Sequence, residues 1–473
     1  MAAATVAPAR AAAFHVLLRE ARGRAPFDVT AATAVAFAPL EARDRALAYE
    51  LVMGTIKRRN SLDRVIAAFS NAASSRVSPD ARESLRLAAF QLLYLDRVPA
   101  HAAVFDAVEM AKGHGGRTAS FVNAVLRKVA ADGRAELSRL SAAETTEALA
   151  LRHSHPEWLV ALWVAELGRE AAEALMAADN LPAQRCVRLN RLRATPAQAQ
   201  ASLARDGIVA RAVPGTSVDG SSDTPDALLL EGPPLEASAA FREGLVTPQS
   251  RGSQLAAAIA AGTRDPAAGG RVADLCAAPG GKTSQLAALL PGWQVLAVDD
   301  EPRRVAALRA NLARLGAADV EVVERDVLAM CDDAAQRGSY DVVLLDAPCS
   351  GLGTLASRPD LRWRRRAGDL GRLAVLERRL LAAAAALVAP GGALTYSVCT
   401  LTRVETLEVV ERFIARGPLD TTSGAGGPTA WALDDLGAAY PGYRHPGNGA
   451  FVQTMPSRDD TTGFFVARLR RVA

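Results

Sequence analysis

The chain has 473 residues, of which half are hydrophobic and 22% are charged, so a disordered, fibrous or disulfide-rich protein is excluded and about three domains are expected. The formal net charge is only +4, yet residues 1–140 hold 20 Lys+Arg against 13 Asp+Glu, or +7, which leaves 35 against 38, or −3, for the remainder. This asymmetry predicts a polyanionic partner for the first part of the chain.

The five cysteines are widely spaced and form neither a Cys-x-x-Cys pair nor a Cys/His cluster. We therefore expect no disulfide framework and no metal site. The apolar stretches are shorter than the roughly 18–20 residues that a spanning helix needs, and we expect no signal peptide at the start of the sequence. We expect a cytoplasmic protein without a membrane partner, and the sequence identifies no protein partner or oligomeric state.

Three regions with different patterns follow one another along the chain. Residues 1–140 repeat apolar side chains at helical spacing, for example over 44–52 and 85–93, and predict an all-helical domain. Residues 141–245 mix helix and strand patterns and predict a small α+β connector. From residue 246 to 473, short apolar strands alternate with helices, which predicts a Rossmann-like α/β domain with a mostly parallel sheet.

Ligands of such sheets bind beyond the carboxyl ends of the strands. The first end, Asp274–Thr283, contains small residues and two glycines, which let backbone amides and a helix N-terminus approach a ligand closely. Its Gly-Lys-Thr resembles the end of an NTPase phosphate loop, but that motif requires glycine where this chain has Cys276. We therefore do not expect a nucleotide hydrolase.

Acidic residues close the next two strands. Asp299 lies 25 positions after Asp274, at a distance along the chain suited to bonding ribose hydroxyls, and Asp326 could reach an adenine edge. A single aspartate at a strand end is more often a turn or helix-capping residue. Because three consecutive strand ends carry one, the pattern predicts a nucleoside ligand.

Two cysteines follow the fourth and fifth strands, in Asp346-Ala347-Pro348-Cys349 and in Tyr396-Ser397-Val398-Cys399. A thiolate that adds to C6 of cytosine converts C5 into a nucleophile for an electrophilic methyl group, and an acid near N3 assists the addition. Asp346 is the candidate acid, and the second cysteine can help remove the C5 proton or release the enzyme. Chemistry alone leaves open which cysteine attacks.

Known families share these motifs. Residues 98–104 and 121–128 resemble the NusB-like RNA-binding domain of bacterial ribosomal RNA methyltransferases, and the turn at 274–283 with the two cysteine motifs resembles the RNA cytosine-5 methyltransferases of the RsmB/Sun type. The resemblance implies S-adenosylmethionine (SAM) as cofactor, a cytosine of 16S ribosomal RNA as substrate, Cys399 as nucleophile, Cys349 in product release and Asp346 at N3. It places the cofactor on Cys276, Ala277, Ala278, Pro279, Gly280, Gly281, Lys282, Asp299, Asp326 and Asp346.

Some positions depart from the family pattern. Val398 stands where a threonine is usual, so a hydroxyl contact to the thiolate or base would be lost. Thr462 stands where Asp-Gly-Phe-Phe begins, and the segment 246–253 differs from the usual Val-Gln-Asp-x-x-Ser/Ala.

A basic segment just after the Cys349 motif is the predicted RNA contact, in which arginines bind phosphate and a tryptophan stacks on a base. Its residues are Arg358, Arg362, Trp363 and Arg364. A buried thiol further implies that the cytosine leaves its stack. Two alternatives remain: a methyltransferase acting on transfer RNA, and a non-catalytic NusB-like RNA-binding or antitermination factor, against which the two cysteines argue.

Overall fold

The computed structural model describes residues 6–23, 29–70, 77–113, 115–213, 223–262, 264–416 and 431–472. It divides into two compact units. The helical unit comprises Met1–Leu181 and Leu355–Arg365, and the sheet unit comprises Pro182–Thr354 and Arg366–Ala473. The segment Leu355–Arg365 therefore belongs to the helical unit, although residues of the sheet unit precede and follow it.

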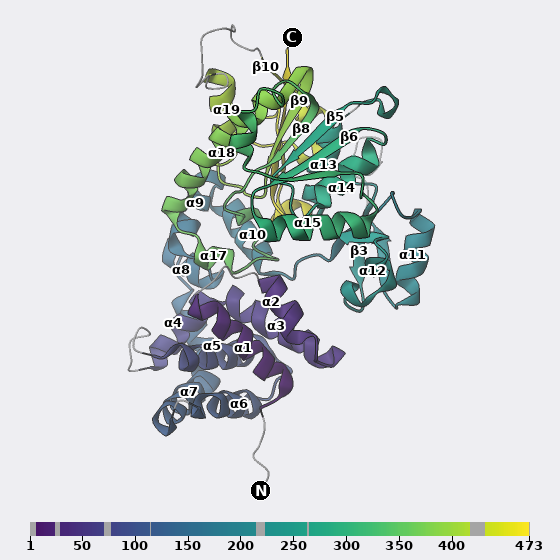
Figure 1. Ribbon diagram of the computed structural model, residues 1–473. Coiled ribbons are helices and arrows are strands. Elements are labelled where there is room, and N and C mark those ends of the chain that lie inside the picture. The colour runs from purple at the N-terminus through teal and green to yellow at the C-terminus, as the bar shows by residue number, and fades with distance from the viewer. Residues whose placement is uncertain are drawn as a thin grey trace. The chain divides into compact units, whose positions relative to one another are not determined.

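An apolar core of the helical unit contains the fully buried side chains of Leu51, Leu85 and Leu126. Local sequence starts its helices: the Ser78 hydroxyl accepts a hydrogen bond from the Ala81 N–H, and proline follows at the first position of α5. The helices, shown from purple to blue in Figure 1, are α1 (Pro8–Arg22), α2 (Val29–Phe37), α3 (Ala42–Lys57), α4 (Arg59–Phe69), α5 (Pro79–Tyr94), α6 (Ala100–Lys112), α7 (Gly116–Leu140), α8 (Thr146–Arg152), α9 (Glu157–Leu167) and α10 (Arg169–Asn180). The short α17 (Leu361–Arg364), from later in the chain and green in Figure 1, also belongs to this unit.

The helical unit is longer than residues 1–140, because α8, α9 and α10 belong to it. Their contacts explain this: the Ser61 hydroxyl of α4 donates to the Leu151 carbonyl, and the Asn60 amide donates to the Ala150 carbonyl. The expected domain boundaries at 140 and 245 stay a prediction, but the compact unit ends at Leu181.

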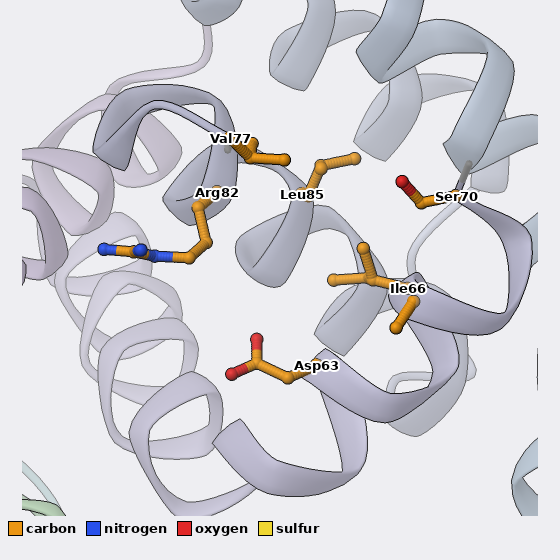
Figure 2. Close-up of a pocket in the computed structure, with 7 residues that line it drawn as sticks. Asp63, Ile66, Ser70, Val77, Arg82 and Leu85 are labelled. Atoms are coloured by element: carbon orange, nitrogen blue, oxygen red, sulfur yellow. The ribbon is translucent and has the colours of Figure 1, made fainter. Parts of the chain in front are cut away.

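A small cavity lies between α4 and α5 in this unit. Figure 2 shows its lining, where Asp63 and Arg82 stand beside apolar side chains such as Ile66 and Leu85. Its volume of about 20 Å³ has room for about one water molecule. It is therefore not a substrate pocket.

The sheet unit begins with a four-stranded antiparallel sheet in the order β2-β3-β1-β4. Thr195 and Gln198 form a capping box at the start of α11. The apolar side chains of Val187, Leu203 and Leu228 pack together in the core of this part. The elements of this part are β1 (Cys186–Leu189), α11 (Pro196–Arg205), β2 (Val209–Ala212), β3 (Ala227–Glu231), η2 (Leu235–Ala237), α12 (Ala239–Arg242) and β4 (Val246–Pro248).

A larger sheet follows in the order β10-β12-β9-β8-β5-β6-β7, with β11 paired to β12. Strands β5 to β9 are parallel, and β12 runs antiparallel to β9. Its strands are β5 (Arg271–Leu275), β6 (Gln294–Asp299), β7 (Glu321–Glu324), β8 (Tyr340–Asp346), β9 (Val388–Val398), β10 (Trp431–Leu433), β11 (Val452–Thr454) and β12 (Phe464–Arg471). The chain passes from β7 to β8 on the other side of β5, so the order reverses between β5 and β8, where ligands bind in open α/β sheets.

Helices cover both faces of this sheet (Figure 1). Alternate strand residues point to opposite faces: Val272 and Val342 pack with α13 and α14, whereas Leu275 and Val343 pack with α16, α18 and α19. The remaining elements are α13 (Arg251–Ala261), η3 (Pro266–Ala268), α14 (Gly281–Leu289), α15 (Pro302–Leu315), α16 (Val327–Cys331), η4 (Leu352–Thr354), α18 (Ala367–Leu387), α19 (Leu407–Arg416), α20 (Leu436–Ala439), η5 (Pro441–Tyr443) and α21 (Pro456–Asp459).

The expected fold class is thus confirmed, with an all-helical part, a small α+β part and an α/β part. None of the helices in the described ranges is both long enough and apolar enough to cross a membrane.

Candidate active site

The turn between β5 and α14 lies at the carboxyl end of the sheet. The Thr283 hydroxyl of α14 donates to the Asp274 carboxylate of β5 at 2.6 Å, which ties the helix start to the strand. Gly280 has a φ of +94°, and a Cβ there would lie 2.7 Å from Leu308, so this turn requires glycine. Burial, followed by the charges of Asp299 and Asp346, raises the pKa of Cys276 to about 12, so that side chain is a neutral thiol.

Asp299 closes β6 next to this turn. Its carboxylate accepts the Ala278 N–H at 3.1 Å and pairs with Arg304 at 3.0 Å. Asp326 follows β7, is exposed, and accepts the Leu328 N–H at 2.8 Å as the capping residue of α16. Because β5, β6 and β7 are parallel neighbours, these acidic residues lie along one edge, as the sequence predicts.

Asp346, at the end of β8, lies between the glycine turn and the strand that leads to Cys399, and it is hydrogen-bonded to both. One of its carboxylate oxygens accepts from the Lys282 ammonium at 2.8 Å and the other from the Ser397 hydroxyl at 2.7 Å. Burial by itself would lower the pKa of Lys282, but the adjacent carboxylate of Asp346 outweighs it and raises that pKa. Lys282 is therefore a permanent cation beside Asp346.

The sulfur atoms of Cys349 and Cys399 lie 3.5 Å apart, and both side chains are half-buried. The hydrogen bond from Cys349 is the largest cause of a lowered pKa for Cys399, to which the Lys282 cation adds. The same hydrogen bond and burial raise the pKa of Cys349 well above the ordinary value. These opposite directions make Cys399 the thiol that ionises more readily.

Ser397 and Lys282 were not foreseen as partners of Asp346. Ser397 lies two positions before Cys399 on β9, and strand alternation could have placed the two on one face. Val398, which lies between Ser397 and Cys399, is fully buried in the apolar core together with Tyr396. A side chain at position 398 therefore contacts the core. The hydroxyl that reaches Asp346 comes from Ser397 instead. The two other segments that depart from the family pattern meet each other, since the Thr462 hydroxyl donates to the Ser250 hydroxyl at 2.7 Å.

The expected RNA contact by Arg362 is wrong. Its side chain is fully buried in the helical unit, where the guanidinium donates to the carbonyls of Lys57, Ser154 and Asp179 and to the Asn180 side chain. A guanidinium in this position cannot reach a phosphate. The sequence could not reveal this, because charged runs are usually exposed.

The Trp363 side chain also makes its contacts inside the helical unit. Its indole N–H donates to the Ile56 carbonyl at 2.7 Å, and its ring packs against the apolar core with Arg59 5.8 Å from the ring centre. Trp363 is only partly buried, so its stacking on a base stays a prediction. Arg364 is exposed and Arg358 partly exposed, and both pair with the buried Asp360.

Within the described residues, no group of three or more His, Cys, Asp or Glu side chains could hold a metal ion. The polar groups at the strand ends are the carboxylates of Asp299, Asp326 and Asp346, the glycine turn, the Lys282 ammonium and the thiols of Cys349 and Cys399.

Comparisons with known proteins agree with this chemistry. Residues 261–470 match the family model "16S rRNA methyltransferase RsmB/F", residues 7–131 match the NusB family, and residues 155–234 match a ferredoxin-like domain of RsmF/B-like methyltransferases. The crystal structure of PH0851 has the same fold, with a TM-score of 0.79 over 99% of this chain and 100% of that one at 24% identity. A methyltransferase homologue from Pyrococcus horikoshii covers 70% of this chain and 100% of its own with a TM-score of 0.57 and 25% identity.

Curated relatives extend over most of the chain. A probable ribosomal RNA small subunit methyltransferase B of Bacillus subtilis is 33% identical over 382 residues, which cover 80% of this chain and 82% of the relative. A putative methyltransferase of Mycobacterium tuberculosis is 35% identical over 98% of this chain and 97% of its own. The chain therefore belongs to the RsmB/F family of SAM-dependent RNA cytosine-5 methyltransferases that carry a NusB N-terminal domain.

Proposed function

We propose that this enzyme methylates C5 of a cytosine in 16S ribosomal RNA through a covalent bond between Cys399 and C6. The observation that carries the proposal is the pair of sulfur atoms 3.5 Å apart beside the Lys282–Asp346 ion pair. The ribosomal target is supported by relatives named ribosomal RNA small subunit methyltransferase B, among them the protein of Vibrio cholerae, which is 34% identical over 80% of this chain.

The strand-end residues fit SAM. This cofactor presents ribose hydroxyls, an ammonium group and a sulfonium charge, and the carboxylates of Asp299, Asp326 and Asp346 are acceptors and anions on consecutive strand ends. We assign the cofactor to these residues and to the turn from Cys276 to Lys282. When bound, SAM supplies the electrophilic methyl group.

The side chains of this chain perform the remaining steps. The Cys399 thiolate forms a bond to C6 of the cytosine, and the electron pair moves toward C5, which then forms the bond to the transferred methyl group. Asp346, which accepts hydrogen bonds from Lys282 and Ser397, shares a proton with N3 of the cytosine, and this proton neutralises the negative charge that develops as the thiolate adds. After methyl transfer a base removes the C5 proton, the bond between Cys399 and C6 breaks, and Cys349 assists this release.

RNA contact is assigned to the basic first part of the chain and to Arg358 and Arg364, whose guanidinium groups are at least partly exposed. The target cytosine must leave its stack, because both thiols are half-buried.

Bisulfite mapping of ribosomal and transfer RNA tests this function. RNA from cells that lack the protein should lose one or a few methylated cytosines in 16S ribosomal RNA, and the intact gene should restore them while Cys399→Ala should not. Purified Cys399→Ala should still bind SAM, because Cys399 lies outside the glycine turn. Loss of sites in transfer RNA alone would support the transfer RNA alternative, and restoration by Cys399→Ala would exclude this nucleophile.

A further inference from the structure

A buried carboxylate is hydrogen-bonded to both of the turns that carry Cys349 and Cys399. Glu405 is fully buried, and its Oε1 accepts the backbone N–H of Ser350 at 2.6 Å. Its Oε2 accepts the hydroxyl of Thr402 at 2.6 Å and that of Thr400 at 3.3 Å. Ser350 directly follows Cys349 and Thr400 directly follows Cys399, so one side chain holds both turns.

Further bonds make this connection rigid. The hydroxyls of Ser350 and Thr400 lie 2.8 Å apart, and the Gly353 N–H donates to the Cys399 carbonyl at 3.0 Å. The Tyr396 hydroxyl donates to the Glu405 main-chain carbonyl at 2.7 Å, which fixes the residue itself. The separation of the two sulfur atoms therefore depends on a hydrogen-bond network centred on Glu405.

The negative charge of this network belongs to Glu405. Its side chain accepts three hydrogen bonds, the pattern of an ionised carboxylate, which has no proton to donate. The second acid nearby, Glu377, is also fully buried. Burial and the adjacent Glu405 raise the pKa of Glu377 to about 10, so Glu377 is neutral near pH 7.

The two cysteines face different groups. Cys349 lies near the Cys399 sulfur, Glu405, Glu377 and the Tyr396 hydroxyl, and the Glu405 charge is one of the causes of its raised pKa. Cys399 faces Cys349 and the Lys282–Asp346 ion pair. At Cys399 the Asp346 charge raises the pKa and the Lys282 charge lowers it, whereas at Cys349 the Glu405 charge raises the pKa. The Glu405 anion therefore favours the proton on the Cys349 sulfur.

We propose that Glu405 is a positioning residue for methyl transfer: it fixes the separation of the two cysteine turns, and its charge keeps the proton on Cys349, so that Cys399 is the sulfur that ionises. The consequence for catalysis rests on the proposed function, in which Cys399 attacks. The distribution of the proton itself is a property of the free enzyme and can be measured without substrate.

The test is the alkylation rate of each cysteine in the full-length protein with iodoacetamide, without RNA or SAM, between about pH 6 and pH 9. Mass spectrometry of the peptides separates Cys349 from Cys399. In the native protein Cys399 should react at lower pH than Cys349. Glu405→Gln removes the charge at nearly constant shape, and the ratio of Cys399 to Cys349 alkylation near neutral pH should fall about tenfold, which corresponds to one pKa unit.

Glu377→Gln is the matched control, because it replaces a buried neutral acid by a neutral amide, and it should keep the native ratio. Glu408→Gln, in a partly exposed ion pair with Arg412, controls for removal of a surface carboxylate. A folded Glu405→Gln protein with the native ratio would overturn the proposal. If this variant does not fold, the native protein decides: alkylation of Cys349 at a pH equal to or below that of Cys399 overturns the proposal.

The alkylation ratio tests the role of Glu405, and the methylation assay tests the nucleophile, so each hypothesis can be refuted without the other. Methylation by Cys399→Ala would refute the nucleophile assignment whatever the ratio, whereas an unchanged ratio refutes the role of Glu405 even if Cys399→Ala is inactive.

Discussion

The Cys349 sulfur lies 3.5 Å from the Cys399 sulfur, close enough for the first thiol to donate a hydrogen bond to the second. The cysteines follow adjacent parallel strands, β8 and β9, whose register pairs Asp346 with Ser397. A thiol that donates to its neighbour stabilises the neighbour as thiolate and keeps its own proton. In the proposed mechanism, this division assigns attack on the base to Cys399 and release to Cys349.

Removal of the donor should trap the enzyme on its substrate. In Cys349→Ala the Cys399 thiolate can still add to C6, but release is slow, so a protein–RNA adduct that survives denaturation should accumulate. Denaturing gel electrophoresis with labelled RNA and SAM measures it. The double variant Cys349→Ala/Cys399→Ala is the control and should give none. Absence of an adduct in the single variant, with methylation intact, would exclude the release role of Cys349.

Loss of the Lys282 cation should shift the pH dependence of the reaction. Lys282 helps to lower the pKa of Cys399, and Lys282→Met leaves the Asp346 charge, which raises that pKa. The thiolate fraction near neutral pH falls, so the single-turnover rate should drop about tenfold and partly recover at higher pH as the thiolate forms. Arg372→Met, in an exposed ion pair on α18, should leave the profile unchanged. An unshifted profile for Lys282→Met would contradict this electrostatic role.

A methyl group on Gly353 should damage the turn after Cys349. Its Cβ would lie 2.2 Å from the Gly463 carbonyl oxygen, which is backbone and cannot rotate away. We expect Gly353→Ala to lose about 1–3 kcal/mol of unfolding free energy in urea melts, together with methyl transfer. Gly371→Ala is the control: its Cβ meets open space within α18, and it should stabilise the protein by about 0.5–1 kcal/mol. Equal stability of the two variants would refute the clash.

Arg362 should matter for stability rather than for RNA affinity. Its guanidinium holds three main-chain carbonyls and lies near the buried Asp179 carboxyl, whose pKa burial raises to about 7 despite the Arg362 charge. Arg362→Met removes the compensating charge and should cost about 3–5 kcal/mol of unfolding free energy. Arg364→Ala should cost less than Arg362→Met, because the buried Asp360 keeps Arg358 as a second partner.

RNA binding by Arg362→Met and Arg364→Ala distinguishes a role in stability from a role in RNA contact. Arg364→Ala should reduce the salt dependence of RNA binding, because an exposed arginine can contact phosphate. Folded Arg362→Met protein should retain the native salt dependence. A reduced salt slope for Arg362→Met would show that this side chain leaves the interior to bind RNA.

The sequence by itself determined the architecture and the edge of the sheet that carries the chemistry. Alternating apolar strands and helices specify a parallel sheet, and parallel strands end at one edge, so Asp299, Asp346, Cys349 and Cys399 could be placed together without coordinates. The resemblance added the assignment of the attacking cysteine, which the residue pattern alone left open.

The tertiary structure decided what each polar residue contacts. Arg362 belongs to a basic run that is typical of an exposed segment, but the chain returns to the helical unit there and buries the guanidinium among carbonyls. Glu405 has no sequence signature, because its partners Ser350 and Thr402 lie on different turns. Periodicity reports only which face of an element is apolar. The partner of a buried charge is fixed by contacts between segments far apart in the chain, so it emerges only when those segments pack.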